Sequence, residues 1–200
     1  LFFKLLLSRE TFHRFNRIVV LGAILLSFLL PLCVITIRRE LPVAPEFFVT
    51  DALPAPVAAD APAPFPWRTL VGMLFLTGAV AACLRTLWSL AAVVRMIRRG
   101  RRERLDDGSV LVRFPQEITP FSWCRFIVIS DGDLVRNGAA ILTHEQAHVR
   151  LHHSFDVLAT DLAGCLQWFN PAMWLLRREL RAIHEYEADA AVLASGVDAR

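Results

Sequence analysis

One stretch of the chain constrains its folding more than any other: no charged residue occurs between Ile18 and Ile37. As a helix, this stretch is long enough to cross the ~30 Å hydrocarbon core of a bilayer. We therefore predict a transmembrane helix at 18–37, kinked at Pro31, a distortion that bilayer helices tolerate. The stretch is too long for the core of a cleavable signal peptide, and no small-residue cleavage site follows it.

A second apolar stretch predicts another transmembrane helix at 67–97. It contains Arg85, and an arginine at mid-bilayer costs a few kcal/mol. Arg85 should therefore face a protein partner or mark where a long helix leaves the lipid, and we favour the latter. The composition agrees with a membrane protein, since 55% of the residues are hydrophobic and the mean hydropathy is +0.45. Membrane lipid is an expected partner.

Basic residues predict the orientation through the positive-inside rule. They flank the two spans on what would be the same side, as Lys4, Arg9, Arg14 and Arg17 and as Arg95, Arg98, Arg99, Arg101, Arg102 and Arg104. We expect a cytoplasmic juxtamembrane segment at 1–17, a Pro/Ala-rich periplasmic loop at 38–66 and a cytoplasmic domain at 98–200. The second arginine run is interpreted as a membrane-flanking anchor, because no aromatic interleaving supports a nucleic-acid partner.

The four cysteines lie far apart without a CxxC pair, so we expect reduced, buried thiols. The chain opens with Leu1 rather than Met. We therefore expect a piece of a longer protein, in which two spans are a lower bound.

The region after the arginines predicts a small α+β domain. β-branched and aromatic residues predict short strands at 109–115 and 124–130. Asp131-Gly132-Asp133 and Asn137-Gly138 predict turns, and from Ala139 onward the pattern is helical.

The motif HEQAH carries the chemistry. His144 and His148 are four residues apart, so on a helix they project within ~40° of each other and can hold one ion. Glu145 lies between them, where a glutamate bonds the water of the metal rather than the metal. This is the HExxH zinc-peptidase motif.

A third ligand distinguishes a catalytic helix from a histidine-rich surface helix. The metzincin pattern is excluded, because Leu151 and Ser154 occupy its glycine and ligand positions. A later helix supplies Glu185 and Asp189, four residues apart. Glu185 is the predicted third ligand of one Zn2+ ion, and Asp189 is predicted to accept the N–H of a ligand histidine and fix its tautomer.

Other acidic and histidine side chains receive weaker assignments. Asp156 either supports the histidine helix without touching the metal or caps a helix. Glu187 is expected to be exposed or ion-paired, and His152, His153 and His184 are expected at the surface or beside the ligands.

The ligand set predicts a mechanism. Two histidines and one glutamate leave a fourth zinc position for water, whose proton Glu145 takes and later passes to the leaving amine. Phe126–Ser130 is the predicted strand edge that holds an extended substrate. The group that stabilises the oxyanion stays open among Tyr186, His184 and an arginine.

The chain resembles a known family in THEQAH, the later HEYEAD, the linking QWFNPAMWLLRREL, the upstream PFSW and the N-terminal KLLLSRETFHRFNR. These motifs are similar to those of the BlaR/MecR-type antirepressor metallopeptidases. The resemblance implies an α-rich membrane protein, with transmembrane helices and a cytoplasmic α+β gluzincin-type zinc metallopeptidase domain with a short sheet. Family ligand positions fall on His144, His148 and Glu185, with Glu145 as the base.

The resemblance also implies a multi-pass protein of the bacterial inner membrane that relieves a cytoplasmic transcriptional repressor, directly or through self-cleavage. A β-lactam signal is not carried over, because the chain has no S-x-x-K serine motif. Two alternatives remain. One is a membrane quality-control or processing peptidase of the HtpX/CAAX type, and the other is a non-catalytic signalling scaffold with a structural zinc site.

Overall fold

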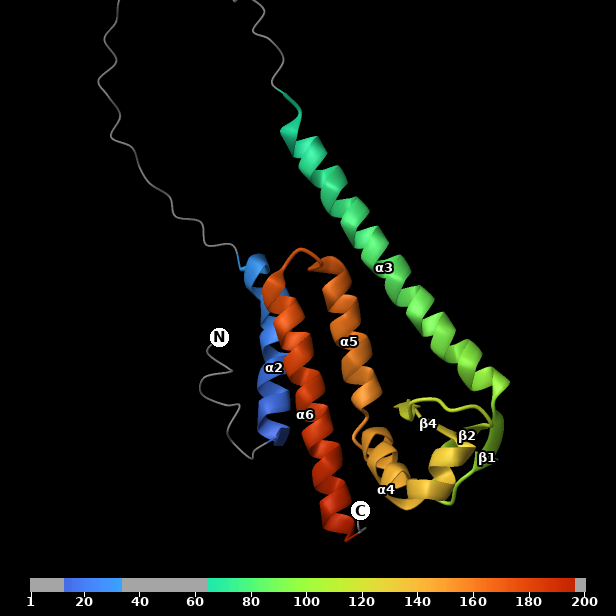
Figure 1. Cartoon of the computed structure of the whole chain (residues 1–200). Helices are drawn as coiled ribbons and strands as arrows, with labels where there is room; N and C mark the ends of the chain where they lie inside the picture. The colour runs from blue at the N-terminus through green and yellow to red at the C-terminus, as the bar shows by residue number, and fades with distance from the viewer. Residues whose placement is uncertain (1–12, 34–64, 197–200) are drawn as a thin grey trace, which may run out of the picture.

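The computed structural model describes residues 13–33 and 65–196 of the chain. The Pro/Ala-rich loop predicted at 38–66 and the residues before His13 fall almost entirely outside these ranges. Figure 1 shows two helices, α5 (His153–Leu166) and α6 (Pro171–Ser195), side by side with α2 (His13–Leu29), while α3 (Trp67–Arg99) runs obliquely to a small sheet. The chain is helix-rich with a short sheet, as predicted.

The two apolar stretches form the helices α2 and α3, both long and apolar enough to cross a membrane. Only 17% of the apolar window around α2 and 6% of that in α3 is buried, unlike the core helix of a soluble protein. Pro31 does not kink a continuing helix as predicted. The α-helix ends at Leu29, and Pro31 lies in the 3-10 turn η1 (Leu30–Leu32), since proline lacks the backbone donor.

The sheet has four strands in the order β1-β2-β4-β3: β1 (Arg101–Arg104), β2 (Val110–Phe114), β3 (Phe121–Trp123) and β4 (Phe126–Ser130). The predicted strands at 109–115 and 124–130 are confirmed as β2 and β4, which pair in parallel. Part of the arginine run forms the edge strand β1, antiparallel to β2. Its interpretation as an anchor alone was therefore incomplete.

The predicted substrate strand Phe126–Ser130 is not an edge. It is β4, which pairs with β2 along its whole length and with β3 over residues 126–128, so most of its backbone groups are already used. Among the residues that the structure describes, the edge strand at this end of the sheet is β3.

Both faces of the sheet are covered. Val112 and Val128 pack against Ile97 near the end of α3. Ile127 and Ile129 face α4 (Asp131–Arg150) and its partly buried residues Leu134, Ile141, Leu142 and Val149. A parallel strand pair buried on both faces explains the nearly continuous apolar sequence of β4.

The turn predicted at Asp131–Asp133 is wrong, because α4 begins there. Ser130 caps the helix by accepting the backbone N–H of Asp133 at 3.0 Å. The turn predicted at Asn137-Gly138 is instead a kink inside α4, where Asn137 departs from helical geometry with φ −139° and ψ 30°.

All four cysteines are free as predicted, but only Cys165 is buried and Cys83 is partly buried. Cys33 is exposed beyond η1, and Cys124 is exposed between β3 and β4 with a positive φ of 53°.

Candidate metal centre

The two histidines of the HEQAH motif lie on one face of α4, with their Nε2 atoms 3.1 Å apart. Glu185 approaches from α6, with one carboxylate oxygen 3.5 Å from His144 Nε2 and the other 3.9 Å from His148 Nε2. These three residues form a group that could hold a metal ion. Two ligand atoms each about 2.1 Å from a tetrahedral zinc lie about 3.4 Å apart, so the donor set fits zinc in kind and spacing.

Asp189 contacts His144 as its spacing from Glu185 predicted. Its Oδ1 lies 3.1 Å from His144 Nδ1. When Nδ1 carries the proton and donates it to this carboxylate, the lone pair of Nε2 is free for a metal.

Glu145 lies in the same helix and is only 7% exposed. Burial raises the pKa of its carboxyl above the ordinary value, whereas a hydrogen bond from Ser122 and the nearby His144 act in the opposite direction. A carboxylate with a raised pKa in a cleft is suited to accept a proton from water.

A buried pair, His153 and Glu187, lies behind His148. Of the two positions expected for His153, the one beside the ligands is found, whereas its contact with Glu187 was not predicted. His148 Nδ1 lies 2.7 Å from His153 Nδ1, and His153 Nε2 lies 2.9 Å from a Glu187 oxygen. If His148 binds a metal through Nε2, its Nδ1–H donates to His153, which in turn donates to Glu187. His153 and Glu187 are 3% and 7% exposed. Since Arg17 also lies 3.4 Å from a Glu187 oxygen, Glu187 is ion-paired rather than exposed.

His148 and His153 are both held neutral. Burial, with help from His144 and His184, lowers the pKa of His148 to about 4. Burial also lowers the pKa of His153 to about 3, with His184 and His148 contributing. A neutral imidazole is the form that binds metals and accepts hydrogen bonds.

Asp156 lies in the first turn of α5, and its hydrogen bonds go to two side chains rather than to a helix end. Its Oδ2 accepts hydrogen bonds from Arg17 Nε at 2.6 Å and from His184 Nε2 at 3.0 Å. Burial raises the pKa of this carboxyl, but the hydrogen bonds from His184 and Arg17 outweigh that effect and lower it overall. Asp156 therefore reaches the histidine helix α4 through Arg17, which also donates to the carbonyl of Leu151.

Arg17 joins the helix α2 to this polar cluster. Besides Asp156 it contacts a Glu187 oxygen at 3.4 Å and donates to the carbonyl of Leu151 at 2.8 Å. His184 is buried and stacks on His153, with ring centroids 4.0 Å apart and planes 11° apart. His152 is exposed, as expected. The sequence signal for the cluster was weak: an arginine directly before an apolar span, and a histidine five residues after His148.

A cleft of about 680 Å³ opens beside the ligands. Pro120, Phe121, Ser122 and Trp123 form one wall, and α4, α5 and α6 supply the others. Of the three kinds of group considered for the oxyanion, His184 and Arg181 line this cleft and Tyr186 does not.

A HExxH helix with a later glutamate, on a helix-rich frame with a small sheet, is the arrangement of a metal-dependent peptidase. Residues 126–200 match the family model described as BlaR1 peptidase M56. The matched residues include all three candidate ligands and Glu145. This match confirms the family resemblance over these residues, which contain THEQAH, QWFNPAMWLLRREL and HEYEAD, whereas PFSW and KLLLSRETFHRFNR lie before them. No curated protein matches the chain.

Proposed function

We propose that the chain is a membrane-anchored zinc metalloendopeptidase, and that it serves as an antirepressor acting at the cytoplasmic face of the bacterial inner membrane. The observation that carries the peptidase proposal is the convergence of His144, His148 and Glu185 beside the buried Glu145. A structural zinc site would normally be closed by four protein ligands, whereas this group supplies three.

Bound zinc would polarise the carbonyl of a peptide and acidify a water molecule. Glu145 would take the proton of that water during its attack on the carbonyl carbon and then deliver it to the leaving amine nitrogen. Asp189 and His153 would hold the two ligand histidines in the tautomer with a free Nε2. Arg181, at the wall of the cleft, is the arginine we assign to the developing oxyanion.

We assign the substrate to the edge strand β3 rather than to β4. It borders the cleft through Phe121, Ser122 and Trp123, and no strand within 13–33 or 65–196 pairs with its outer side. An extended peptide laid along this edge would gain backbone hydrogen bonds with little demand on its sequence.

The contacts of Arg17 support a site close to the membrane boundary. Arg17 directly precedes the apolar stretch and contacts Asp156 and Glu187, which adjoin the ligand helices. Together with the distribution of basic residues, this supports cleavage on the cytoplasmic side, where a repressor, or the chain itself, would be the substrate.

Replacing Glu145 with glutamine tests the proposal, because glutamine keeps the shape but cannot accept the proton. Zinc content should be unchanged, while cleavage of the chain itself or of a co-encoded repressor should fall roughly 10²–10⁴-fold. His144→Ala should lose zinc, and Glu117→Gln, at a carboxylate 80% exposed on the surface, should change neither property.

The outcome separates the alternatives. If repressor signalling in cells survives in Glu145→Gln, the hypothesis of a non-catalytic signalling scaffold replaces that of a peptidase. If cleavage is lost but the substrates prove to be misfolded membrane proteins, the quality-control reading replaces the antirepressor.

A further inference from the structure

The hairpin made by α5 and α6 lies between the two apolar helices. On one side, Met173, Leu180 and Ile183 of α6 form a buried cluster with Val20 and Ile24 of α2. On the other side, the Trp168 indole donates to the carbonyl of Phe75 in α3 at 3.2 Å. Figure 1 shows the turn of the hairpin beside the far end of α2, with α3 extending beyond it.

Two independent contacts give the depth of the turn. Gln167 bonds Ser27 in α2 at 2.8 Å, and Ser27 lies ten residues after Arg17, or about 15 Å along a helix. In α3, Trp67 would lie at the opposite surface of the membrane. Phe75 is eight residues further along this helix, which is about 12 Å from Trp67. The two distances together approach the ~30 Å of the hydrocarbon core. If α2 and α3 cross the membrane, the turn lies near its middle.

The surface of the hairpin near the turn is apolar. Five large side chains there are each more than half exposed: Leu162, Leu166, Phe169, Trp174 and Leu175. In water such a patch would be unfavourable, whereas in lipid it would match its surroundings.

The polar groups of the turn are bonded within the protein. Asn170 donates to Gln167 at 2.8 Å and caps α6 by accepting the N–H of Ala172 at 3.0 Å. The Trp174 indole donates to the carbonyl of Trp168 at 3.0 Å. In water, the polar groups of a turn can form hydrogen bonds with water. Inside hydrocarbon they need hydrogen-bond partners within the protein.

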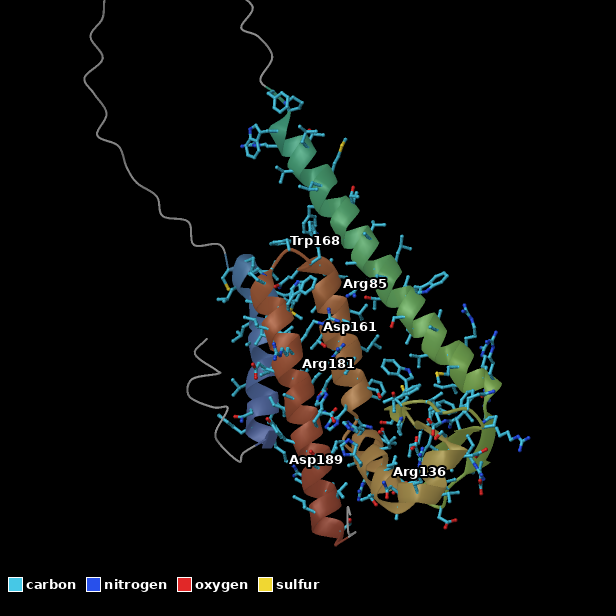
Figure 2. The ribbon with its side chains drawn as sticks, viewed as in Figure 1. Arg85, Arg136, Asp161, Trp168, Arg181 and Asp189 are labelled. Atoms are coloured by element: carbon cyan, nitrogen blue, oxygen red, sulfur yellow. The ribbon has the colours of Figure 1, made fainter. Side chains whose placement is uncertain are left out.

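The charges of the hairpin limit its depth. Asp161 and Arg177 pair with each other, which is the way that ionised groups at membrane depth are neutralised. Arg178 is the first exposed charge after the turn and lies seven residues, or about 10 Å, beyond Pro171, and its long side chain can reach further toward the headgroups. Figure 2 shows the same order along the hairpin, with Trp168 nearest the turn, then Asp161, Arg181 and Asp189.

We propose that the turn of the α5–α6 hairpin inserts from the cytoplasmic side into the hydrocarbon between α2 and α3, and that lipid acyl chains cover its five exposed apolar residues. The candidate metal ligands, Glu185 in the second half of α6 and His144 and His148 on α4, would then stay in water just outside the membrane. Substrate segments would reach the cleft along the membrane surface. The inference rests on α2 and α3 crossing the bilayer and does not depend on peptidase activity.

Nitroxide labels on single cysteines test the insertion in the full chain, with its four native cysteines replaced, in vesicles of phosphatidylethanolamine and phosphatidylglycerol. Labels at Phe169 and Leu175 should collide with oxygen far more than with a water-soluble nickel complex. Leu74 in α3 is the lipid reference and Val135 in α4 the aqueous one, since both side chains are well exposed. The oxygen-to-nickel ratio at Phe169 should resemble that at Leu74.

Three results would overturn the proposal. A ratio at Phe169 like that at Val135 would put the turn in water. Poor collision with both reagents would mean that protein, either another segment of this chain or a second copy, covers the patch. A label at Leu74 that collides mainly with the nickel complex would mean that α3 does not cross the membrane there.

A second measurement avoids labelling. Brominated lipids should quench part of the tryptophan fluorescence, and Trp174→Phe should remove a quenchable component. Trp123→Phe, on β3, should remove an unquenched one. If Trp174→Phe leaves the quenchable fraction unchanged, the turn is not in contact with acyl chains.

Discussion

At the scale of single residues, the candidate metal centre depends on how the ligand histidines are held from behind. His144 is oriented by the exposed Asp189, and His148 by the buried His153 and Glu187. Partners of this kind fix the tautomer and the ring orientation of a ligand, and their loss commonly lowers metal affinity 10–100-fold. The two histidines therefore differ in how much solvent reaches their support.

We predict that His153→Ala lowers zinc affinity about 10–100-fold, because His148 loses the acceptor for its Nδ1–H. His153→Asn should recover part of the loss, since its amide oxygen can take the place of the imidazole Nδ1. Competition with a zinc-binding dye measures both. His152→Ala, at the exposed neighbour, is the control and should bind zinc normally; equal affinity in all three variants would contradict this role of His153.

The candidate ligand group could be predicted from the sequence, whereas for His153 the sequence left two positions open, at the surface or beside the ligands. The pairs His144/His148 and Glu185/Asp189 are each local, because a spacing of four residues puts two side chains on one helical face. His153 begins another helix after His152, which adopts a left-handed conformation with φ 58°. Its contacts with His148 and Glu187 depend on how three helices pack, and no local pattern encodes that.

At the scale of secondary-structure elements, the packing of α3 against the hairpin relies on a close approach at Gly78. A Cβ added there would lie 2.2 Å from the ring of Trp168. The ring also bonds the Phe75 carbonyl, so it cannot move without losing that contact. The missing side chain thus lets the two elements meet.

Gly78→Ala should therefore destabilise the fold by about 1–3 kcal/mol, the usual cost of overpacking. Thermal unfolding in detergent measures the change. Gly72→Ala is a matched control on the same helix, because a Cβ there would meet no atom within 4 Å. Similar unfolding of the two variants would mean that the hairpin and α3 are not packed as described.

The elements predicted correctly were those with a strong local pattern. β2 and β4 are runs of β-branched residues buried on both faces, and α3 is a long apolar helix. β1 has a fully exposed, mostly arginine sequence and exists through pairing with β2, while β3 has three residues, too few to show alternation. At residues 130–133 the start of a helix and a turn use the same residue types, and the helix formed, capped by Ser130.

At the scale of the whole molecule, topology is open to a direct test. Basic residues flank both spans on one side, so a reporter inserted near Asp60 should behave as periplasmic and one joined after Arg104 as cytoplasmic. Alkaline phosphatase and a fluorescent protein report the two compartments. The reverse pattern would remove cytoplasmic repressors from the possible substrates.

Arg17 connects the apolar helix α2 to the buried acids that adjoin the ligands. Its guanidinium contacts Asp156, Glu187 and the Leu151 carbonyl, and both carboxylates are largely buried. Removing the cation would leave two buried carboxylates with fewer partners, so Arg17→Gln should cost on the order of 3 kcal/mol.

Arg17→Lys should fall between wild type and Arg17→Gln, because an ammonium keeps the charge but cannot reproduce three directed contacts. Arg14→Gln, at an exposed position one turn earlier, is the control. Unfolding in detergent gives stability, and zinc titration shows whether the loss reaches His148 through Glu187 and His153. If Arg17→Gln matches Arg14→Gln in both measurements, α2 only lies beside the peptidase part. If both properties fall, a displacement of α2 has a physical route to the metal ligands.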